Sequence, residues 1–351
     1  MKYSKSSIQL DALIALKRKG RQSDVLDARL AFTDAESIRR YVAPLERRAR
    51  VYPNHLPTQA SGRWSTTDPP LVNFTKRTEY GPNGIRDIVV PDPGTIWVGW
   101  DWDGIEAVLA AILSGEESDL VHIRARHDLH TITGCHIFKL PLPPVLTKAG
   151  IYGREGEAWR RDTGWSATDW RRDAAKTARY ALGYSLEASA ILEARGAMDI
   201  VAAIASATGP STKQATQRLI AIGSDYLHSR PRLVAWKARV MTQCAETGLS
   251  RTFLGRVRRL YGDRRDKMKQ GLNHQAQGAV ADMMNLTILA VLGAYPDATL
   301  VVNRHDGCEI AVPAGLDIDL VPFVERTWDV AGTSHMFSAS YHRVEAVACG
   351  R

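Results

Sequence analysis

The clearest structural signal in the sequence is a β-hairpin near the carboxyl end of the chain. Two runs that are rich in β-branched residues, ATLVVN (298–303) and CEIAVP (308–313), flank the segment RHDG. Asp-Gly is a favoured turn sequence between paired strands, so the pattern predicts an antiparallel hairpin over 298–313 with Asp306 at its turn. Any fold for this chain has to provide a sheet that accepts this hairpin.

A second strand signal lies some 200 residues earlier. The run TIWVGWDW (95–102) is rich in aromatic and β-branched residues and predicts a buried strand, and EAVLAAIL directly after it predicts a helix. Because the two strand signals are far apart, we expect an α+β fold with an antiparallel sheet built from distant segments. Further helices are expected around 8–16, after a capping box formed by Thr33 and Glu36, and over 170–194, 212–243 and 273–292. We expect irregular chain over 62–93 and a loop or insertion over 139–168.

The composition favours an anionic partner. The 351 residues include 46 Lys and Arg against 38 Asp and Glu, which gives a net charge of +8, and 44% of the chain is hydrophobic. A nucleic acid, a membrane surface or an acidic protein would each suit this charge. The four cysteines are scattered, and we find neither a signal peptide nor a stretch approaching a membrane span, so a reducing cytoplasm is expected.

Two aspartates lie at the ends of the predicted strands. Asp101 closes the early strand and Asp306 lies in the hairpin turn, and each alone is an ordinary turn or cap residue. If one sheet brings them together, the two carboxylates can hold a pair of divalent ions, as phosphoryl transfer requires. Asp103 could add a third carboxylate.

A stripe of cations and rings recurs every four residues in RDAAKTARYALGYS. On a helix, one face would present the side chains of Arg172, Lys176, Tyr180 and Tyr184. Such a face can grip a triphosphate and stack a base or sugar. The alternative is a solvated basic face with its aromatic stems packed on the protein.

Two amides, Asn273 and Gln277, lie one helical turn apart after the basic stretch RTFLGRVRRLYGDRRDKMK. Amide groups can donate to the acceptors that every base pair offers in the minor groove, while arginines contact phosphates. Solvated polar residues after a basic loop are the alternative.

Taken in order, these motifs resemble the polymerase domain of family A DNA polymerases over about residues 62–330. GRWSTTDPPLVN is similar to the entry segment of that family, which puts Arg63 at a primer-template contact. DWDGIEAVLAAILSGE resembles motif A, so Asp101 would be a metal ligand and Glu106 would exclude the ribose 2′-hydroxyl. DLHT places His130 at the incoming triphosphate.

The remaining motifs extend the resemblance. RDAAKTARYALGYS resembles motif B, which implies that Arg172 and Lys176 bind triphosphate, that Tyr180 lies against the sugar and that Tyr184 lies beside the templating base. RHDG resembles motif C. This implies that Asp306 is the second metal ligand.

The DNA contacts that the resemblance implies complete the set. TFLGRVRRL and NHQAQGAVADMM are similar to two further segments of the family. His305 would lie near the primer terminus. The other residues implied to face the duplex are Arg256, Arg258, Asn273 and Gln277.

The resemblance therefore implies a DNA-directed DNA polymerase with a right-hand fold. Its substrates would be dNTPs on primer-template DNA, and its cofactors two Mg²⁺ ions that Mn²⁺ could replace. Lys176 would also donate a proton to pyrophosphate, and His130 would add positive charge. The cytoplasm of a bacterium or of a phage-infected host is the expected location, with no membrane partner.

The sequence departs from the motifs at several positions. Gly104 and Val108 replace Gln and Arg in motif A, Gly307 replaces an acidic residue in motif C, and Ser185 replaces the glycine after Tyr184. Because the metal-binding aspartates and the triphosphate-binding cations remain, these departures bear on rate and fidelity more than on the type of reaction.

The lengths of the segments suggest a compact polymerase. We expect a reduced thumb over 1–60, palm over 61–127 and 241–351, and fingers over 128–240 with a motif B helix near 169–190 and an insertion at 139–165. The chain has no room for a proofreading exonuclease of normal size. A separate thumb, clamp or exonuclease protein could complete it.

Two other functions remain open at this point. A DNA-binding module with little or no catalysis would also fit the small thumb and the missing acid at Gly307. A single-subunit RNA polymerase or a reverse transcriptase would share the hand-like fold, although Glu106 and Tyr184 argue against it.

Overall fold

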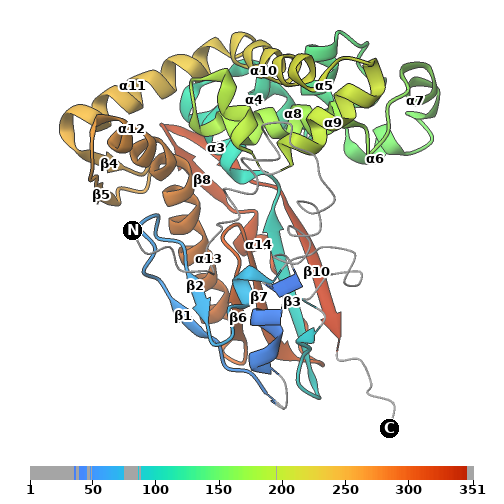
Figure 1. Ribbon diagram of the computed structural model, residues 1–351. Helices are drawn as coiled ribbons and strands as arrows, with labels where there is room; N and C mark the ends of the chain where they lie inside the picture. Colours follow the sequence, from blue (N-terminus) through green and yellow to red (C-terminus); the bar gives the residue numbers. More distant parts are fainter. Residues whose placement is uncertain are drawn as a thin grey trace. The chain divides into compact units, whose positions relative to one another are not determined.

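The computed structural model describes residues 35–36, 39–45, 48, 50–74, 86, 88–194 and 196–345 (Figure 1). Its contacts divide the chain into two compact units. The first, here called the sheet unit, comprises Met1–Trp102, Met283–Arg326 and Ala339–Arg351. The second, the helical unit, comprises Asp103–Asp282 and Thr327–Ser338. The predicted palm, fingers and thumb boundaries differ from this division and stay a prediction.

The sheet unit is built on a four-stranded antiparallel sheet in the order β10-β3-β7-β6. Strand β3 (Thr95–Trp102) lies between β10 (Ala339–Glu345) and β7 (Gly307–Pro313), and β7 pairs with β6 (Thr299–Asn303). The early strand and the late hairpin therefore share one sheet, and the predicted α+β class is confirmed.

Aromatic burial explains why TIWVGWDW forms the central strand. Trp100 and Trp102 are 0% and 1% exposed, and the indole of Trp102 donates to the carbonyl of Val324 over 3.1 Å. A smaller apolar cluster joins Leu45, Phe74 and Val302. The short elements of this unit are η1 (Ala43–Leu45), β1 (Asn54–Leu56), β2 (Ser65–Thr67), η2 (Leu71–Asn73) and α14 (Val321–Val324).

The helical unit packs most of its helices around one apolar core (Figure 1). Its helices begin with α3 (Ile105–Ser114), α4 (Glu117–Arg124) and α5 (Leu129–Phe138) and continue with α8 (Trp170–Ala181), α9 (Ala197–Thr208), α10 (Thr212–His228) and α11 (Pro231–Thr247). Two small hairpins complete it: β4 (Leu249–Arg251) with β5 (Val257–Arg259), and β8 (Thr327–Val330) with β9 (Thr333–Met336).

The segment 139–165 is more regular than expected. It contains helices α6 (Lys148–Tyr152) and α7 (Glu157–Thr163), and Thr147 caps the first of them. Its tryptophans form a small core with Cys135 and Ile151, and a β-carbon on Gly134 would lie 2.4 Å from the Trp165 ring. The loop expectation was wrong, because the proline and glycine punctuation hid two short helices that are stabilised by aromatic packing.

The motif B helix is shorter than predicted. Helix α8 ends at Ala181. Two 3₁₀ segments follow it, η5 (Leu182–Tyr184) and η6 (Ala188–Glu193). The helical conformation is interrupted at Ser185, because this residue adopts an extended backbone with φ −139° and ψ 153°. The predicted helix around 8–16 and the predicted cap Thr33 lie outside the described residues.

One continuous helical segment links α12 (Arg264–Asn273), the π-helix η7 (His274–Gly278) and α13 (Ala279–Ala294). Its most apolar window has a mean hydropathy of 1.3, so by length and composition the segment could cross a membrane. Our expectation that no stretch comes near this was wrong. However, 56% of that window is buried inside the protein, and a core helix passes the same test, so the segment indicates a membrane only weakly.

Candidate active site

Strand register brings the two predicted aspartates together at one end of the sheet, here called the acidic end. Asp101 pairs with Gly307, the residue after Asp306. The amide of Trp102 donates to the carbonyl of Asp306 over 2.9 Å. Two residues that are 205 positions apart in sequence thus sit on adjoining strand ends, as the sequence predicted.

Gly307 is required by the close approach of β3. A β-carbon there would lie 2.9 Å from the carbonyl oxygen of Trp100 and 3.2 Å from Oδ2 of Asp101. The Asp101 carboxylate therefore occupies the space beside Gly307. The departure from an acidic residue at this position has a steric reason in this chain.

Two basic residues adjoin Asp306. Burial and the nearby charge of Arg63 lower the pKa of His305 to about 4. Burial also lowers the pKa of Arg63, and the charge of Asp306 opposes that effect. His305 has a φ of 78°, a left-handed conformation that is uncommon outside glycine and asparagine, and its amide donates to the Asn303 side chain over 3.2 Å. The structure thus gathers Arg63, His305 and Asp306.

An ion pair that sequence reasoning missed holds the turn from the other side. Arg304 donates to both carboxylate oxygens of Glu309, over 3.2 and 3.1 Å, and to the carbonyl of Leu71. His342 reaches the same carboxylate at 3.4 Å. Burial alone would raise the pKa of Glu309, but the hydrogen bond from His342 and the charge of Arg304 lower it to about 2. The opposite charges of Arg304, the first residue of RHDG, and Glu309, two residues after that segment, were the signal that could have revealed this pair.

In the helical unit, α8 carries the predicted stripe of Arg172, Lys176 and Tyr180. Asp169 caps the helix, and Arg172 pairs with the buried carboxylate of Asp128 at 3.3 Å. The ring of Tyr180 lies 5.8 Å from that of His130, centre to centre. These four residues, all predicted to bind the nucleotide, therefore come together on α5 and α8.

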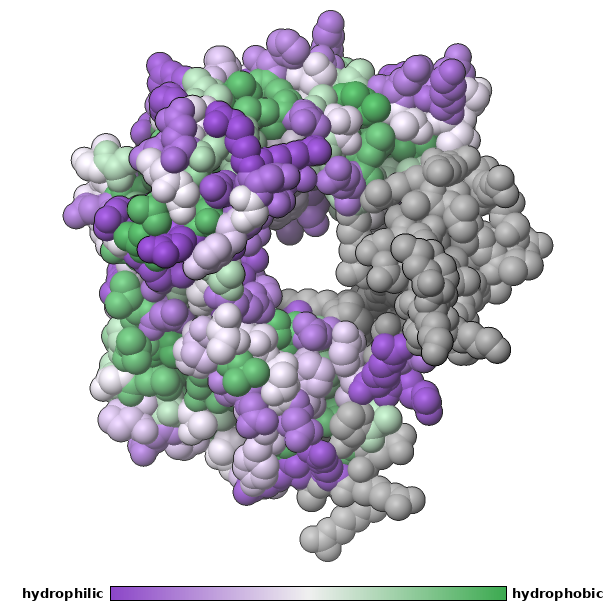
Figure 2. All heavy atoms as spheres, turned by 60° about the vertical axis from the view of Figure 1, so that its left-hand side comes forward, coloured by the Kyte–Doolittle hydropathy of each residue, from purple (hydrophilic) through white to green (hydrophobic). Residues whose placement is uncertain are grey.

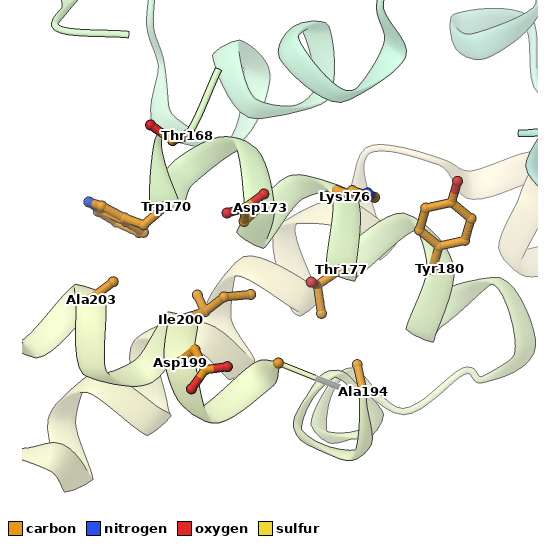
Figure 3. A pocket seen from close by; sticks show the side chains of 11 residues that line it. Thr168, Trp170, Asp173, Lys176, Thr177, Tyr180, Ala194, Asp199, Ile200 and Ala203 are labelled. Carbon is orange, nitrogen blue, oxygen red and sulfur yellow. The ribbon is translucent and has the colours of Figure 1, made fainter. Parts of the chain in front are cut away.

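A pocket of about 550 Å³ runs along α8 and includes two of these side chains. Figure 3 shows Asp173, Lys176 and Tyr180 on α8, and Asp199 and Ile200 on the neighbouring α9, among the residues that line the pocket. Lys176 is exposed and Tyr180 is 42% exposed. Both side chains are therefore accessible to a bound molecule.

His130 does not carry the charge we expected. Burial, together with the positive charge of Arg179, lowers the pKa of His130 to about 3. The imidazole is therefore neutral near pH 7. In the free protein, the positive charge on this surface comes from Arg172 and Lys176, and His130 can offer only a hydrogen bond.

The predicted sugar and base contacts also lie together. Glu106, in the first turn of α3, lines a small pocket with Tyr180, Gly183 and Tyr184. Gly104 caps α3 with a φ of 59°, and a β-carbon on it would lie 4.0 Å from the Tyr180 hydroxyl. A left-handed cap explains why glycine stands where the family has glutamine.

A buried charge network behind α8 was also missed from the sequence. Asp119 accepts from Arg179 of α8 and from Arg230 at the start of α11, at 2.9 and 3.0 Å. Both arginines also donate to Thr133 of α5. Burial alone would raise the pKa of Asp119, but the two guanidinium charges lower it to about 2. The network joins four helices of the helical unit.

The predicted duplex contacts lie around the π-helix and the β4–β5 hairpin. Asn273 ends α12 and Gln277 lies within η7, both half-buried. Arg256 donates to the carbonyl of Gly278 and pairs with Asp282, while Arg258 bonds Gln270 over 3.3 Å. Arg256 thus supports the π-helix internally, and its role toward DNA stays a prediction.

The outer face of this region mixes charge and apolar groups. Figure 2, which brings the left-hand side of Figure 1 forward, shows hydrophilic side chains interspersed with hydrophobic patches. On the hairpin and after it, Leu249, Val257 and Tyr261 are 44%, 47% and 68% exposed beside arginines. Exposed rings and arginines on one surface suit stacking and phosphate contacts.

Asp101 and Asp306 are the carboxylates of the acidic end that could hold a metal ion. Among the described residues, no group of three or more His, Cys, Asp or Glu side chains is placed to hold an ion. Mg²⁺, however, is commonly held by one or two carboxylates together with substrate phosphates, so Asp101 and Asp306 fit this ion. Asp103 belongs to the helical unit, where its amide donates to the Ser338 carbonyl. Its role as a third carboxylate stays a prediction.

Comparisons with known proteins point the same way. A family model described as DNA polymerase family A matches residues 7–327. The thermostable DNA polymerase I of Thermus filiformis is 26% identical over 299 residues, covering 82% of this chain and 30% of the relative. DNA polymerase I of Pseudomonas aeruginosa is 26% identical over 265 residues, covering 72% and 24%. The chain thus spans less than a third of the length of these relatives.

A solved structure shows the same fold. The POL domain of Pol1 from M. smegmatis, in a complex with DNA primer-template and dNTP, covers 98% of this chain and 57% of its own, with a TM-score of 0.71 and 23% identity. This likeness establishes the fold of the chain.

Proposed function

This chain belongs to DNA polymerase family A, and from that premise we propose that it adds deoxynucleotides to a primer 3′-hydroxyl under the direction of a DNA template. The observation that carries the proposal is the register of β3 with β7, which places Asp101 beside the turn of Asp306. Paired carboxylates at a strand end are what nucleotidyl transfer needs to organise its ions.

Asp101 and Asp306 would hold two Mg²⁺ ions, and Mn²⁺ could take their place. When bound, such ions lower the pKa of the attacking hydroxyl and offset charge on the leaving pyrophosphate. The carboxylates are held by main-chain pairing, so the protein organises this end before substrate arrives. Arg63 and His305 adjoin it and would contact the primer strand.

The α8 residues would bind the nucleotide. Arg172 and Lys176 supply positive charge to the triphosphate, and Lys176 can give a proton to the departing pyrophosphate. His130, neutral in the free protein, would donate a hydrogen bond. Binding of the triphosphate would favour the protonated imidazole and raise its pKa.

Glu106, Tyr180 and Tyr184 would inspect the sugar and the base pair. Their shared pocket supports this assignment. A ribose 2′-hydroxyl would meet Glu106, and a misfitting pair would displace Tyr184 and prevent the reactive geometry. Asn273, Gln277, Arg256 and Arg258 would contact the duplex.

The proposal places proofreading outside these 351 residues, because the family match occupies 7–327. A separate thumb, clamp or exonuclease protein would then complete the enzyme, and the cytoplasm of a bacterium or phage-infected host would be its location. A DNA-binding module with little catalysis is the second candidate, favoured by the missing carboxylate at Gly307.

Single-nucleotide incorporation tests the proposal. Purified protein is given a labelled primer on four templates that differ in the next base, one dNTP at a time, with Mg²⁺ or with a chelator. We expect extension only by the complementary dNTP and only with the metal. Binding without extension in Mg²⁺ or Mn²⁺ would support the DNA-binding module, and equal use of ribonucleotides would indicate an RNA polymerase.

A further inference from the structure

Lys237 is a fully buried lysine in the middle of α11. Its exposed fraction is 0%, and its ammonium group donates to the carbonyl oxygens of Leu182 and Ser185 over 2.5 and 2.8 Å. Burial lowers the pKa of Lys237 to about 8. In the described part of the chain, these two main-chain carbonyls are the hydrogen-bond partners that the ammonium group has.

Burying a cation without a carboxylate beside it is costly, and an apolar side chain of the same length would avoid that cost. Two other buried cations of this unit differ, since Arg179 and Arg230 share the carboxylate of Asp119. A buried charge that pairs only with carbonyls points to a geometric role. The position of the two carbonyls in the fold then indicates which segment Lys237 holds in place.

The two carbonyls bracket Tyr184. Leu182 begins the 3₁₀ turn η5, and Ser185 follows that turn with an extended backbone. The last carbonyls of a helix have no partner within it and form the negative end of its dipole, so a cation there satisfies both needs. Lys237 thus caps the carboxyl end of the α8–η5 segment and holds Leu182 and Ser185, between which Tyr184 lies.

The side chain of Tyr184 has no comparable anchor. Its hydroxyl is buried and has no hydrogen-bond partner among the described residues. The ring lines the pocket that also contains Glu106 and Tyr180. The position of the ring therefore depends on packing and on the main-chain turn that Lys237 holds.

Helix α11 holds α8 at a second point. Arg230, seven residues before Lys237, bonds Asp119 at the same place as Arg179 of α8. Seven residues are about two helical turns, so both cations lie on one side of α11. The same helix thus braces α8 near its carboxyl end and holds the turn that follows it.

We propose that Lys237 is a positioning residue that fixes the Leu182–Ser185 turn and so sets how strictly Tyr184 tests the incoming nucleotide. The inference rests on the proposed function for the role of Tyr184. The location of Ser185, where the family motif has glycine, supports it: in this chain the turn is held by a side chain from another helix.

Lys237→Met tests the inference, because it keeps the length of the side chain and removes the donors. We expect the KM for the matched dNTP to rise about tenfold and the preference over a mismatched dNTP to fall about tenfold, since a small displacement of a positioning group has effects of this size. The kcat for the matched dNTP should change less. Lys213→Met removes an exposed lysine of α10 and is the matched control.

A double-mutant cycle separates positioning from general structure. In a Tyr184→Ala background, Lys237→Met should have little further effect on mismatch discrimination, because the group through which it acts is gone. An unchanged effect in that background, or unchanged KM and discrimination in the single variant, would overturn the inference. If Lys237→Met does not fold, Lys237→Gln keeps an N–H donor and should show a smaller change in the same quantities.

A measurement that does not depend on activity distinguishes this inference from the proposed function. With 3-fluorotyrosine at position 184, the parent chain and Lys213→Met should each give one ¹⁹F resonance, and Lys237→Met should give a shifted or second resonance. Identical spectra in all three would overturn the inference even if the protein extends primers. Failure of the parent chain to extend primers, with the spectral change present, would contradict only the proposed function.

Discussion

The acidic end of the sheet unit and the cationic stripe of the helical unit are held in place by different means. Asp101 and Asp306 are positioned by strand pairing, with the backbone of β3 hydrogen-bonded to β7. Arg172, Lys176 and Tyr180 lie on a helix that is fixed by buried side chains from its neighbours. Main-chain pairing tolerates most side-chain changes, whereas a buried charge network depends on each of its members.

The largest effect is expected in the helical unit, from Asp119→Ala. The change leaves Arg179 and Arg230 buried without their shared carboxylate, which should lower the free energy of unfolding by about 3–5 kcal/mol. Urea denaturation measures it. Asp225→Ala removes an exposed carboxylate of α10 and should change stability by less than about 0.5 kcal/mol. Equal losses in both variants would show that the network does not hold the helices.

Lys176→Ala should leave the fold intact and reduce catalysis. Lys176 is exposed on α8, so its loss removes a charge from the triphosphate site without disturbing the core. We expect kcat/KM for the matched dNTP to fall about 100-fold, as for the loss of one preorganised electrostatic contact. Steady-state extension measures this, with Lys213→Ala as control. An unchanged kcat/KM would remove Lys176 from the site.

Gly307→Ala tests the sheet unit by steric means. The added β-carbon would meet the Trp100 carbonyl oxygen at 2.9 Å, and strand backbone cannot yield as a flexible side chain can. We expect a loss of about 1–3 kcal/mol in stability. Thermal denaturation at one pH measures it. No loss would mean that β3 and β7 are less closely paired at Asp101 than the register indicates.

Glu309 controls how the stability of the sheet unit responds to acid. Its pKa is depressed from 4.5 to about 2, so its contribution to stability is complete above pH 4.5 and is lost as the pH falls toward 2. Glu309→Gln should therefore flatten the decline of stability between these values. Denaturation across that range would show it, and an identical acid profile in the variant would contradict the role of the Arg304–Glu309 pair.

The sequence was most informative where structure is local. The strand 95–102, the hairpin 298–313 and the helix with its Arg172, Lys176 and Tyr180 spacing each follow from patterns within about fifteen residues. The family resemblance then joined Asp101 to Asp306, and the strand register agrees with it. Composition alone could not have paired them.

What was missed depends on contacts between distant residues. The buried network joins Asp119 to Arg230 across 111 positions, and Lys237 reaches Leu182 across 55. Nothing in the local sequence marks a lysine in a helix as buried. The loss of charge on His130 was missed for the same reason, since its low pKa follows from burial beside Arg179. The helices within 139–165 depend on tryptophan packing that the prolines concealed.

The most direct test of the account is primer extension by Asp306→Ala beside the parent chain, with Mg²⁺ and the matched dNTP. The sheet register places this carboxylate next to Asp101, so its loss should reduce extension to the level without metal, while a band-shift assay finds primer-template binding largely intact. Extension by Asp306→Ala at the rate of the parent chain would contradict the claim that these two aspartates organise nucleotide transfer.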